Sequence, residues 1–321
     1  MNPAPTARTV IIEIDQEGQR IDNFLIAQLK GVPKSKIYNI IRSGEVRVNS
    51  GRIKPLYRLV AGDAVRIPPI RVASRDEKSF THDKNALGLL KSRILYEDKG
   101  LFILNKPSGM AVHGGSGVSM GVIENLRALY PQEKSLELAH RLDRDTSGCL
   151  IVSKKASVLK QLHTLLREGG KEAESGVEKI YIALVQGNWP KYLKQIDAPL
   201  HKNQLISGER VVKVRPDGKP SLTTFQVLER FGHATLIEAR PQTGRTHQIR
   251  VHALHAGHPV AGDDKYGEKE FNKQMRKYGC KHLFLHAARV AFTLPATGQH
   301  IDIQAPLDPD MKVCLERLRE M

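Results

Sequence analysis

A long polar segment divides this chain and limits what it can fold into. Between Arg71 and Gly88 the sequence RVASRDEKSFTHDKNALG is rich in charge and has no apolar period, which is typical of a linker rather than of a packed element. The 321 residues are enough for two domains. We therefore expect a flexible N-terminus over residues 1–15, a small domain over 16–75, a linker over 76–88 and a larger domain over 89–321.

The small domain shows helical periodicity followed by strand periodicity. Apolar residues recur at four-residue spacing from Ile21, which predicts a helix over Gln19–Lys30. A second helix is predicted over Lys36–Ser43, with Ser35 as its N-cap. An Asn-Ser-Gly turn at 49–51 then joins two short strands. The pattern indicates two short helices and a β-hairpin.

The chain carries a large positive charge. Its 50 Lys and Arg residues against 34 Asp and Glu give a net charge of +16. Such a surplus favours a polyanionic partner, most often nucleic acid, over a basic surface that is merely solvated. The charge alone therefore indicates a nucleic-acid-binding protein.

Cysteine usage and hydropathy indicate a cytoplasmic location. The three cysteines, Cys149, Cys280 and Cys314, form no CxxC pair and no disulfide framework, which fits a reducing compartment. The N-terminus has no apolar core of a secretory signal. No window approaches the ~20 apolar residues of a membrane span. We expect no membrane association.

The larger domain is dominated by short strands with interspersed helices, which predicts an α+β fold around a mixed or antiparallel sheet. Helices are predicted over 156–167 and 246–256. The predicted strands are 94–96, 101–104, 149–152, 180–185, 223–228 and 234–238.

Four ionisable residues, Arg141, Asp143, Arg144 and Asp145, lie just before the apolar run Cys149–Val152. Desolvation at the start of a buried strand pushes a carboxylate toward its neutral form, and a neighbouring guanidinium keeps it ionised. An ionised, positioned carboxylate can act as a base, a nucleophile or a metal ligand. On spacing alone, a structural ion pair remains the favoured alternative.

The stretch RPQTGRTHQIRVHALHAGHP, residues 240–259, combines three arginines with four histidines. Thr246 is the expected helix cap, with Ile249 and Ala253 facing inward and Arg250 adjoining that face.

A metal site is the simplest alternative interpretation of this stretch, because His252 and His255 lie three residues apart. The usual zinc spacings are absent and the surrounding cations would repel a metal ion. We therefore expect His252, His255 and His258 to be packing or hydrogen-bonding residues.

Tyr181 begins an otherwise aliphatic strand, EKIYIALVQG. A core tyrosine with a satisfied hydroxyl and an aromatic that stacks on a flipped base are equally open. No GxxxxGK[ST] loop or strand–GxGxxG–helix unit occurs, and the glycines of 113–121 indicate a flexible loop. Nucleotide hydrolysis and hydride transfer are therefore unsupported.

Two families share these motifs. The small domain resembles the S4 RNA-binding domain through QRIDNFL, SKIYNIIRSGEVRVN and VAGDAVRI. The chain as a whole resembles the RluA-type pseudouridine synthases through HRLDRDTSG, YIALV, GRTHQIRVH, LNKPSGMAVH and LFLHA. The second resemblance covers nearly the whole chain.

The resemblance implies isomerisation of uridines to pseudouridine in RNA, without a cofactor or metal. Asp143 would be the catalytic nucleophile, Arg250 would keep it ionised, and Tyr181 would stack on the flipped uracil. Arg141 would contact the distorted RNA, by filling the space that the flipped base leaves or by binding phosphate. Further RNA contacts are expected from Lys36, Arg42, Arg47, Lys106 and Arg245.

The implied substrate is 23S rRNA or a large-subunit assembly precursor, modified at several uridines. A monomer is expected because no exposed apolar stripe stands out in the sequence. Two alternatives remain open: a non-catalytic S4-type RNA-binding or ribosome-assembly factor, and the same chemistry on tRNA. The polar patch Glu168–Glu178 is longer than the family pattern, which bears on the choice of modified sites rather than on catalysis.

Overall fold

The computed structural model describes residues 6–29, 32–70, 84–114, 120–168, 176–204 and 210–320. The chain separates into two compact units, residues 1–81 and 82–321. The first part of the expected linker and most of the polar patch Glu168–Glu178 lie outside the described residues. So does the centre of the predicted glycine loop at 113–121.

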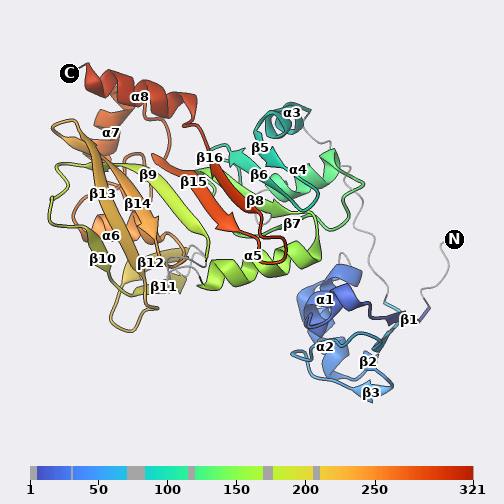
Figure 1. The fold of residues 1–321 in the computed structure, drawn as a ribbon. Helices are drawn as coiled ribbons and strands as arrows, with labels where there is room; N and C mark the ends of the chain where they lie inside the picture. Colours follow the sequence, from blue (N-terminus) through green and yellow to red (C-terminus); the bar gives the residue numbers. More distant parts are fainter. Residues whose placement is uncertain are drawn as a thin grey trace. The chain divides into compact units, whose positions relative to one another are not determined.

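The first unit, blue in Figure 1, contains a four-stranded antiparallel sheet in the order β1-β4-β2-β3. Its core joins both predicted helices, because Leu25, Ile37 and Ile40 are all fully buried. The predicted hairpin turn is confirmed, with Asn49 and Ser50 both at positive φ. The elements are β1 (Arg8–Ile11), η1 (Ile14–Gln16), α1 (Ile21–Gln28), α2 (Lys34–Arg42), β2 (Arg47–Val48), β3 (Gly51–Arg52) and β4 (Ala64–Ile67).

Two expectations for this unit are corrected. Residues 8–11 were assigned to a flexible N-terminus, but they form β1 and pair with β4. The β-branched run from Thr9 to Ile12 favours a strand, and Ile12 is buried. Helix α2 begins at Lys34 after Pro33, not after Ser35. Proline fixes φ near the helical value and so starts the helix early.

The second unit is built on a ten-stranded sheet in the order β10-β13-β14-β9-β15-β8-β6-β5, with β16 beside β15 and β7 beside β8. Strands β8 and β15 are parallel and their neighbours are antiparallel, so the predicted mixed sheet and α+β fold are confirmed. The strands are β5 (Ile94–Glu97), β6 (Leu101–Lys106), β7 (Glu137–Leu138), β8 (Ser147–Ser153), β9 (Glu178–Gln186), β10 (Gln195–Asp197), β13 (Leu222–Arg230), β14 (Ala234–Pro241), β15 (Leu285–Thr293) and β16 (His300–Gln304).

Outside this sheet, β11 (Leu200–Gln204) and β12 (Arg210–Val214) form a separate hairpin. The helices of the second unit are α3 (Lys84–Ser92), α4 (Val122–Leu129), α5 (Ala156–Glu168), α6 (Gln248–His255), α7 (Lys269–Lys277) and α8 (Pro309–Arg319). Within the described residues, no helix is long and apolar enough to cross a lipid bilayer.

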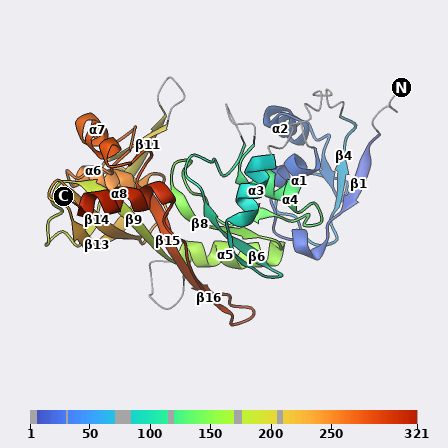
Figure 2. The same cartoon turned by 90° about the horizontal axis from the view of Figure 1, so that it is seen from above.

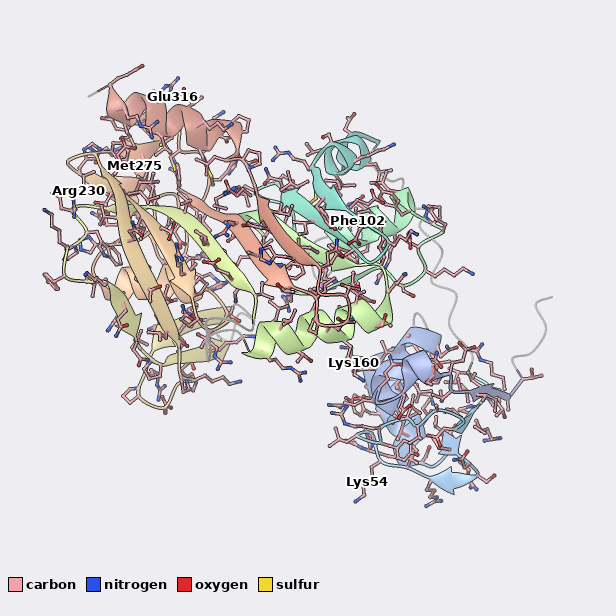
Figure 3. All side chains as sticks on the ribbon, in the orientation of Figure 1. Lys54, Phe102, Lys160, Arg230, Met275 and Glu316 are labelled. Carbon is pink, nitrogen blue, oxygen red and sulfur yellow. The ribbon has the colours of Figure 1, made fainter. Side chains whose placement is uncertain are left out.

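The sheet has two halves with separate cores, and Figure 2 shows its strands and helices from above. One half packs β6 and β8 against α4 and α5, and every residue of those two strands is buried. The other half packs β9 and β14 against α6 on one core and against α7 and α8 on another. Phe102 and Met275, labelled in Figure 3, are buried in the first and second halves respectively. Strand β15 lies between β8 and β9 and joins the halves.

The expected boundary of the larger domain is also corrected. Helix α3 begins at Lys84, so residues 84–88 of the expected linker are helical. Leu90 is fully buried in the core that contains β6 and β8. The charged segment before this helix, together with Lys84 at its start, outweighed its short apolar face when the segment was judged by composition.

Gly148 permits the parallel contact between β8 and β15. It has φ +103°, and a Cβ built on it would lie 2.2 Å from the carbonyl oxygen of Ala287. Since Ala287 is its register partner, relieving this clash would push the two halves of the sheet apart.

We expect Gly148→Ala to lower the free energy of unfolding by about 3 kcal/mol or more, through steric overlap and left-handed strain together. Gly232→Ala is the matched control, since Gly232 also has positive φ but no atom near its Cβ position. The control should cost roughly 1 kcal/mol. Urea unfolding of both variants measures the difference, and equal losses would remove the close approach as a constraint.

Candidate active site

The loop between β7 and β8 carries Asp143 and is tied to β8 by one backbone bond and one bond to a histidine ring. The amide of Ala139 donates to the Ile151 carbonyl at 3.0 Å, and the Ile151 amide donates to Nε2 of His140 at 3.1 Å. Burial lowers the pKa of His140 to about 4, so its ring accepts this bond in the neutral form. The Thr146 N–H donates to the Asp143 carbonyl and closes a turn, which positions the Asp143 carboxylate.

Lys106 holds the same loop from β6. Its Nζ donates to the carbonyls of Pro107, Met110 and Arg144 at 2.8, 2.9 and 2.8 Å. The Ser108 hydroxyl adds a bond of 2.8 Å to the Asp145 carbonyl. Burial lowers the pKa of Lys106 to about 7, and three carbonyl acceptors match the three N–H donors of an ammonium group.

The expected RNA contact by Lys106 is therefore wrong. Its exposed fraction is 0%, and its three donors are directed to backbone carbonyls. Lys106 ends a strand that is buried along its whole length. The largely apolar run LFILN precedes Lys106 and indicates burial. The sequence analysis gave more weight to the charge of Lys106.

Arg250, on α6, is held by a buried carboxylate that the sequence analysis missed. Its Nε and Nη2 each donate to Asp263 at 2.7 Å. The Asp263 side chain has 0% exposure and also accepts the backbone N–H groups of Lys265 and Tyr266 at 3.0 Å. Burial would raise the pKa of Asp263, but the bonds from Arg250 and these amides outweigh it and hold the pKa below its usual range.

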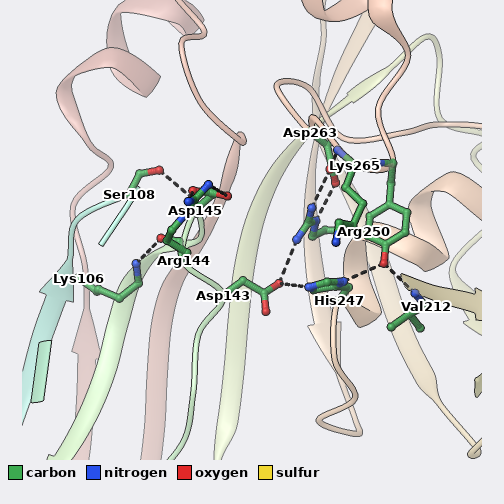
Figure 4. Close-up of polar contacts among 11 residues, drawn as sticks. Lys106, Ser108, Asp143, Arg144, Asp145, Val212, His247, Arg250, Asp263 and Lys265 are labelled. Carbon is green, nitrogen blue, oxygen red and sulfur yellow. Dashed lines mark hydrogen bonds and ion pairs between the residues drawn. The ribbon is translucent and has the colours of Figure 1, made fainter. Parts of the chain in front are cut away.

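The predicted pairing of Arg250 with Asp143 is present as a longer contact. Nη1 of Arg250 lies 3.3 Å from Oδ2 of Asp143, so Asp263 is the tighter partner. The Asp143 side chain is 29% exposed, whereas the Asp263 side chain is fully buried. In Figure 4, Asp143 faces Arg250 and His247 from the loop that Lys106 holds.

His247 approaches Asp143 from a second direction. Its Nε2 lies 3.7 Å from Oδ2 of Asp143, and its Nδ1 lies 2.8 Å from the Tyr266 hydroxyl. It precedes α6 in the left-handed conformation, so it replaces Thr246 as the residue that starts the helix. No sequence pattern signalled this conformation.

Tyr181 lies on β9, beside Ala239 of β14 and Ala287 of β15. It is half-buried and packs against the cores of both halves of the sheet. Burial and the nearby charge of Asp143 raise the pKa of its hydroxyl. The structure thus brings Asp143, Arg250 and Tyr181 into one region where the halves meet.

The basic residues singled out in the sequence as RNA contacts are exposed, apart from Lys106. Arg141 is exposed on the loop of Asp143. Arg245 is exposed, with Nε 3.2 Å from the Pro220 carbonyl. Lys36, Arg42 and Arg47 are exposed on the first unit.

Two histidines of the 240–259 stretch behave as the sequence analysis expected. His252 is fully buried, with its two ring nitrogens bonded to the Thr223 hydroxyl and the Ala198 carbonyl. Nδ1 of His258 lies 2.7 Å from the Gln186 carbonyl. Both are hydrogen-bonding residues of the fold.

Chemically, the arrangement offers a carboxylate held by a guanidinium beside an aromatic ring. An ionised carboxylate in such a site can act as a nucleophile or a base. The aromatic ring offers a stacking surface for a planar base.

Known proteins match this chain along most of its length. The profile of a family described as RNA pseudouridylate synthase matches residues 100–255, and that of the S4 domain matches residues 19–65. Ribosomal large subunit pseudouridine synthase C of Yersinia pestis is 57% identical over 98% of this chain and 97% of its own length. The Escherichia coli K12 protein of the same name is 56% identical over 98% of both chains. The fold is similar to that of human RNA pseudouridylate synthase domain containing 4, with a TM-score of 0.59 and 24% identity over 73% of this chain and 96% of that one.

The buried pair predicts the effect of Asp263→Asn. Asparagine has nearly the same shape but leaves the buried Arg250 guanidinium without its anionic partner, and we expect a loss of about 3 kcal/mol at pH 7. Because the pKa of Asp263 is lowered on folding, its stabilising effect is present above pH ~4 and is lost as the pH falls through the folded-state pKa. The difference from wild type should therefore shrink in strong acid.

Urea unfolding at pH 7 and at pH 3 measures both effects. Asp264→Asn is the matched control, since the neighbouring Asp264 side chain is 89% exposed, and it should change stability little at either pH. A difference between wild type and Asp263→Asn that stays constant with pH would contradict the assigned role of the charge.

Proposed function

This chain belongs to the RNA pseudouridylate synthase family and is an isomerase, and from that premise we propose that it converts uridines of large-subunit ribosomal RNA to pseudouridine with Asp143 as the catalytic carboxylate. The observation that carries the assignment of Asp143 is its partly exposed side chain, 3.3 Å from a guanidinium that Asp263 fixes from behind.

The reaction requires no net change of oxidation state. The N1–C1′ bond of uridine breaks, the uracil turns, and C5 bonds to C1′. The C5 proton leaves and N1 gains a proton, so atoms and charge balance. Asp143 acts at C1′ or on the base to free the uracil, and Arg250 is proposed to pair with its carboxylate for that step.

Tyr181 is proposed to stack on the extruded uracil. Its raised pKa keeps the hydroxyl protonated at neutral pH, so it serves as a neutral ring and a hydrogen-bond donor. Arg141 is proposed to contact the distorted RNA around the flipped nucleotide, because it is exposed two residues from Asp143 and a guanidinium can stack or bind phosphate.

The substrate part of the proposal rests on the names of the 56–57% identical relatives, which act on the ribosomal large subunit, and on the net charge of +16. We propose that the first unit grips the RNA through exposed side chains such as Lys36, Arg42 and Arg47, and that Arg245 adds a contact. We further propose that the substrate is protein-free or partly assembled 23S rRNA, modified at several uridines. The enzyme is proposed to act as a cytoplasmic monomer without a cofactor.

Tritium release from RNA labelled at uracil C5 tests the reaction, because forming the C5–C1′ bond expels that hydrogen. We expect release from a 23S transcript but not from a tRNA transcript. Asp143→Ala should bind the 23S transcript normally and release at least about 100-fold more slowly. Release by Asp143→Ala at the wild-type rate would reject its assignment.

Two further outcomes of this assay favour the alternatives. Release from tRNA alone would move the same chemistry to a different substrate. Binding of 23S RNA with no release by the wild-type protein would favour a non-catalytic assembly factor.

Salt dependence tests the proposed grip of the first unit. Each phosphate neutralised contributes roughly 0.7–0.9 to the slope of log affinity against log salt concentration. Replacing Lys36, Arg42 and Arg47 together by alanine should therefore weaken RNA binding and reduce that slope by about 2 to 3. Filter binding at several salt concentrations measures it. The rate at saturating enzyme should be unchanged, and an unchanged slope would show that these side chains do not contact phosphate.

A further inference from the structure

We propose that His247 is a positioning residue for Asp143, which holds the carboxylate together with Arg250 by directing an Nε2–H donor at it. This inference rests on the proposed function of Asp143 and adds a residue to it. Three features of the structure carry it: the backbone of His247, the hydrogen bonds of its ring, and the oxygen atom that it approaches.

The backbone of His247 is strained at the place where the side chain meets Asp143. Its φ and ψ are 53° and 22°, in the left-handed region that non-glycine residues seldom occupy. The other two non-glycine residues with positive φ in the described ranges, Asn49 and Ser50, form a hairpin turn that requires that conformation. His247 lies in no hairpin. Such strain persists where a side chain must be aimed at a site.

A chain of hydrogen bonds fixes the ring of His247. The Val212 amide donates to the Tyr266 hydroxyl at 3.0 Å, and that hydroxyl lies 2.8 Å from Nδ1 of His247. A carboxylate only accepts hydrogen bonds, so we assign the donor on the Asp143 side to Nε2 of His247, which leaves Nδ1 to accept from the Tyr266 hydroxyl. The single proton of the neutral ring then lies on Nε2, which faces Asp143.

The charges around the ring favour this neutral donor form. Asp143 and Asp263 act to raise the pKa of His247, and Arg250 and Lys265 act to lower it. Burial has the largest effect and the net pKa is lowered, which fits a side chain that is 13% exposed. An Nε2–H directed at the Asp143 carboxylate is also electrostatically favourable, whereas a lone pair there would be repelled.

Tyr266 couples the two groups that hold Asp143. Its ring meets the His247 ring edge-on, with centroids 5.4 Å apart. The Arg250 guanidinium carbon lies 5.0 Å from the Tyr266 ring centroid. Tyr266 is itself buried and its amide donates to Asp263. His247 and Arg250 are thus fixed against one support.

Two donors restrict a carboxylate more than one does. The terminal torsion of an aspartate is broad, so a single contact to one oxygen leaves the carboxylate plane free to turn. Arg250 and His247 both make their closest approach to Oδ2 of Asp143 from different directions. Together they fix the plane and present Oδ1 as the reacting oxygen.

Substitution of His247 by asparagine and by glutamine separates the effect of the side-chain donor on turnover from the effect of the left-handed backbone on stability. Asparagine tolerates the left-handed backbone well, but its amide is too short to reach Asp143. Glutamine is less suited to that backbone, yet its side-chain N–H reaches the position of Nε2. We therefore expect the asparagine variant to have the higher melting temperature, because it suits the backbone. We expect the glutamine variant to have the higher turnover rate, because it keeps the donor.

The measurement is single-turnover tritium release at saturating enzyme, with RNA affinity and melting temperature determined for each variant. We expect His247→Asn to react roughly 10-fold more slowly than wild type, because Asp143 loses the donor that faces its Oδ2. His247→Gln should remain within about threefold of wild type. Both should bind RNA with unchanged affinity. Tyr266→Phe, which keeps the ring and removes the hydroxyl, should also react more slowly.

Rates that follow melting temperature, with asparagine equal to or faster than glutamine, would overturn the role of the donor. Wild-type release that depends on Asp143, together with wild-type rates in all three variants, would overturn this inference and leave the proposed function standing. No release by the wild-type protein would overturn both.

Discussion

The buried pair between Arg250 and Asp263 is the interaction on which the candidate active site depends. A fully buried ion pair contributes little net stability, because desolvation of two charges offsets their attraction. The role of the pair in this site is to fix the orientation of the Arg250 guanidinium. Two of the guanidinium nitrogens are fixed at 2.7 Å by Asp263, and this fixes where the third nitrogen points. Asp143 receives a cation whose position was set without it.

The fold supplies a second constraint from the opposite side. Lys106 and Ser108 grip the backbone of the Asp143 loop rather than its side chains. The carboxylate is therefore held by its main chain from one half of the sheet and by its side chain from the other. A serine on the first strand after the loop extends this arrangement, since Ser147 bonds to the buried His286 of β15 at 2.8 Å. Strand β15 thereby sets the spacing between the two supports.

The sequence was informative about the residues that lie at the site and less so about those behind it. Asp143, Tyr181 and Arg250 belong to short motifs with strong local patterns. Asp263 and Tyr266 belong to no pattern, because their importance arises from contacts with α6 made only after the chain has folded.

Two other residues show which physical signals a sequence conveys poorly. The left-handed conformation of His247 is a property of one backbone torsion that its neighbours do not encode. Lys106 was misread because charge usually means exposure, whereas a buried ammonium is tolerated when carbonyls satisfy all its donors. The fold class followed from strand-dominated periodicity, and α3 was missed where charge masked a short apolar face.

The contact between Arg250 and Asp143 joins residues that are 107 positions apart, and its support at Asp263 lies further still along the chain. A ribosome that has made the first half of the sheet has therefore produced the carboxylate without Arg250 and Asp263, which hold its side chain from the other half. The RNA grip proposed for the first unit would therefore be complete long before the proposed reactive group is assembled. Competence for chemistry arrives late and in one step, when the second half of the sheet docks onto β15.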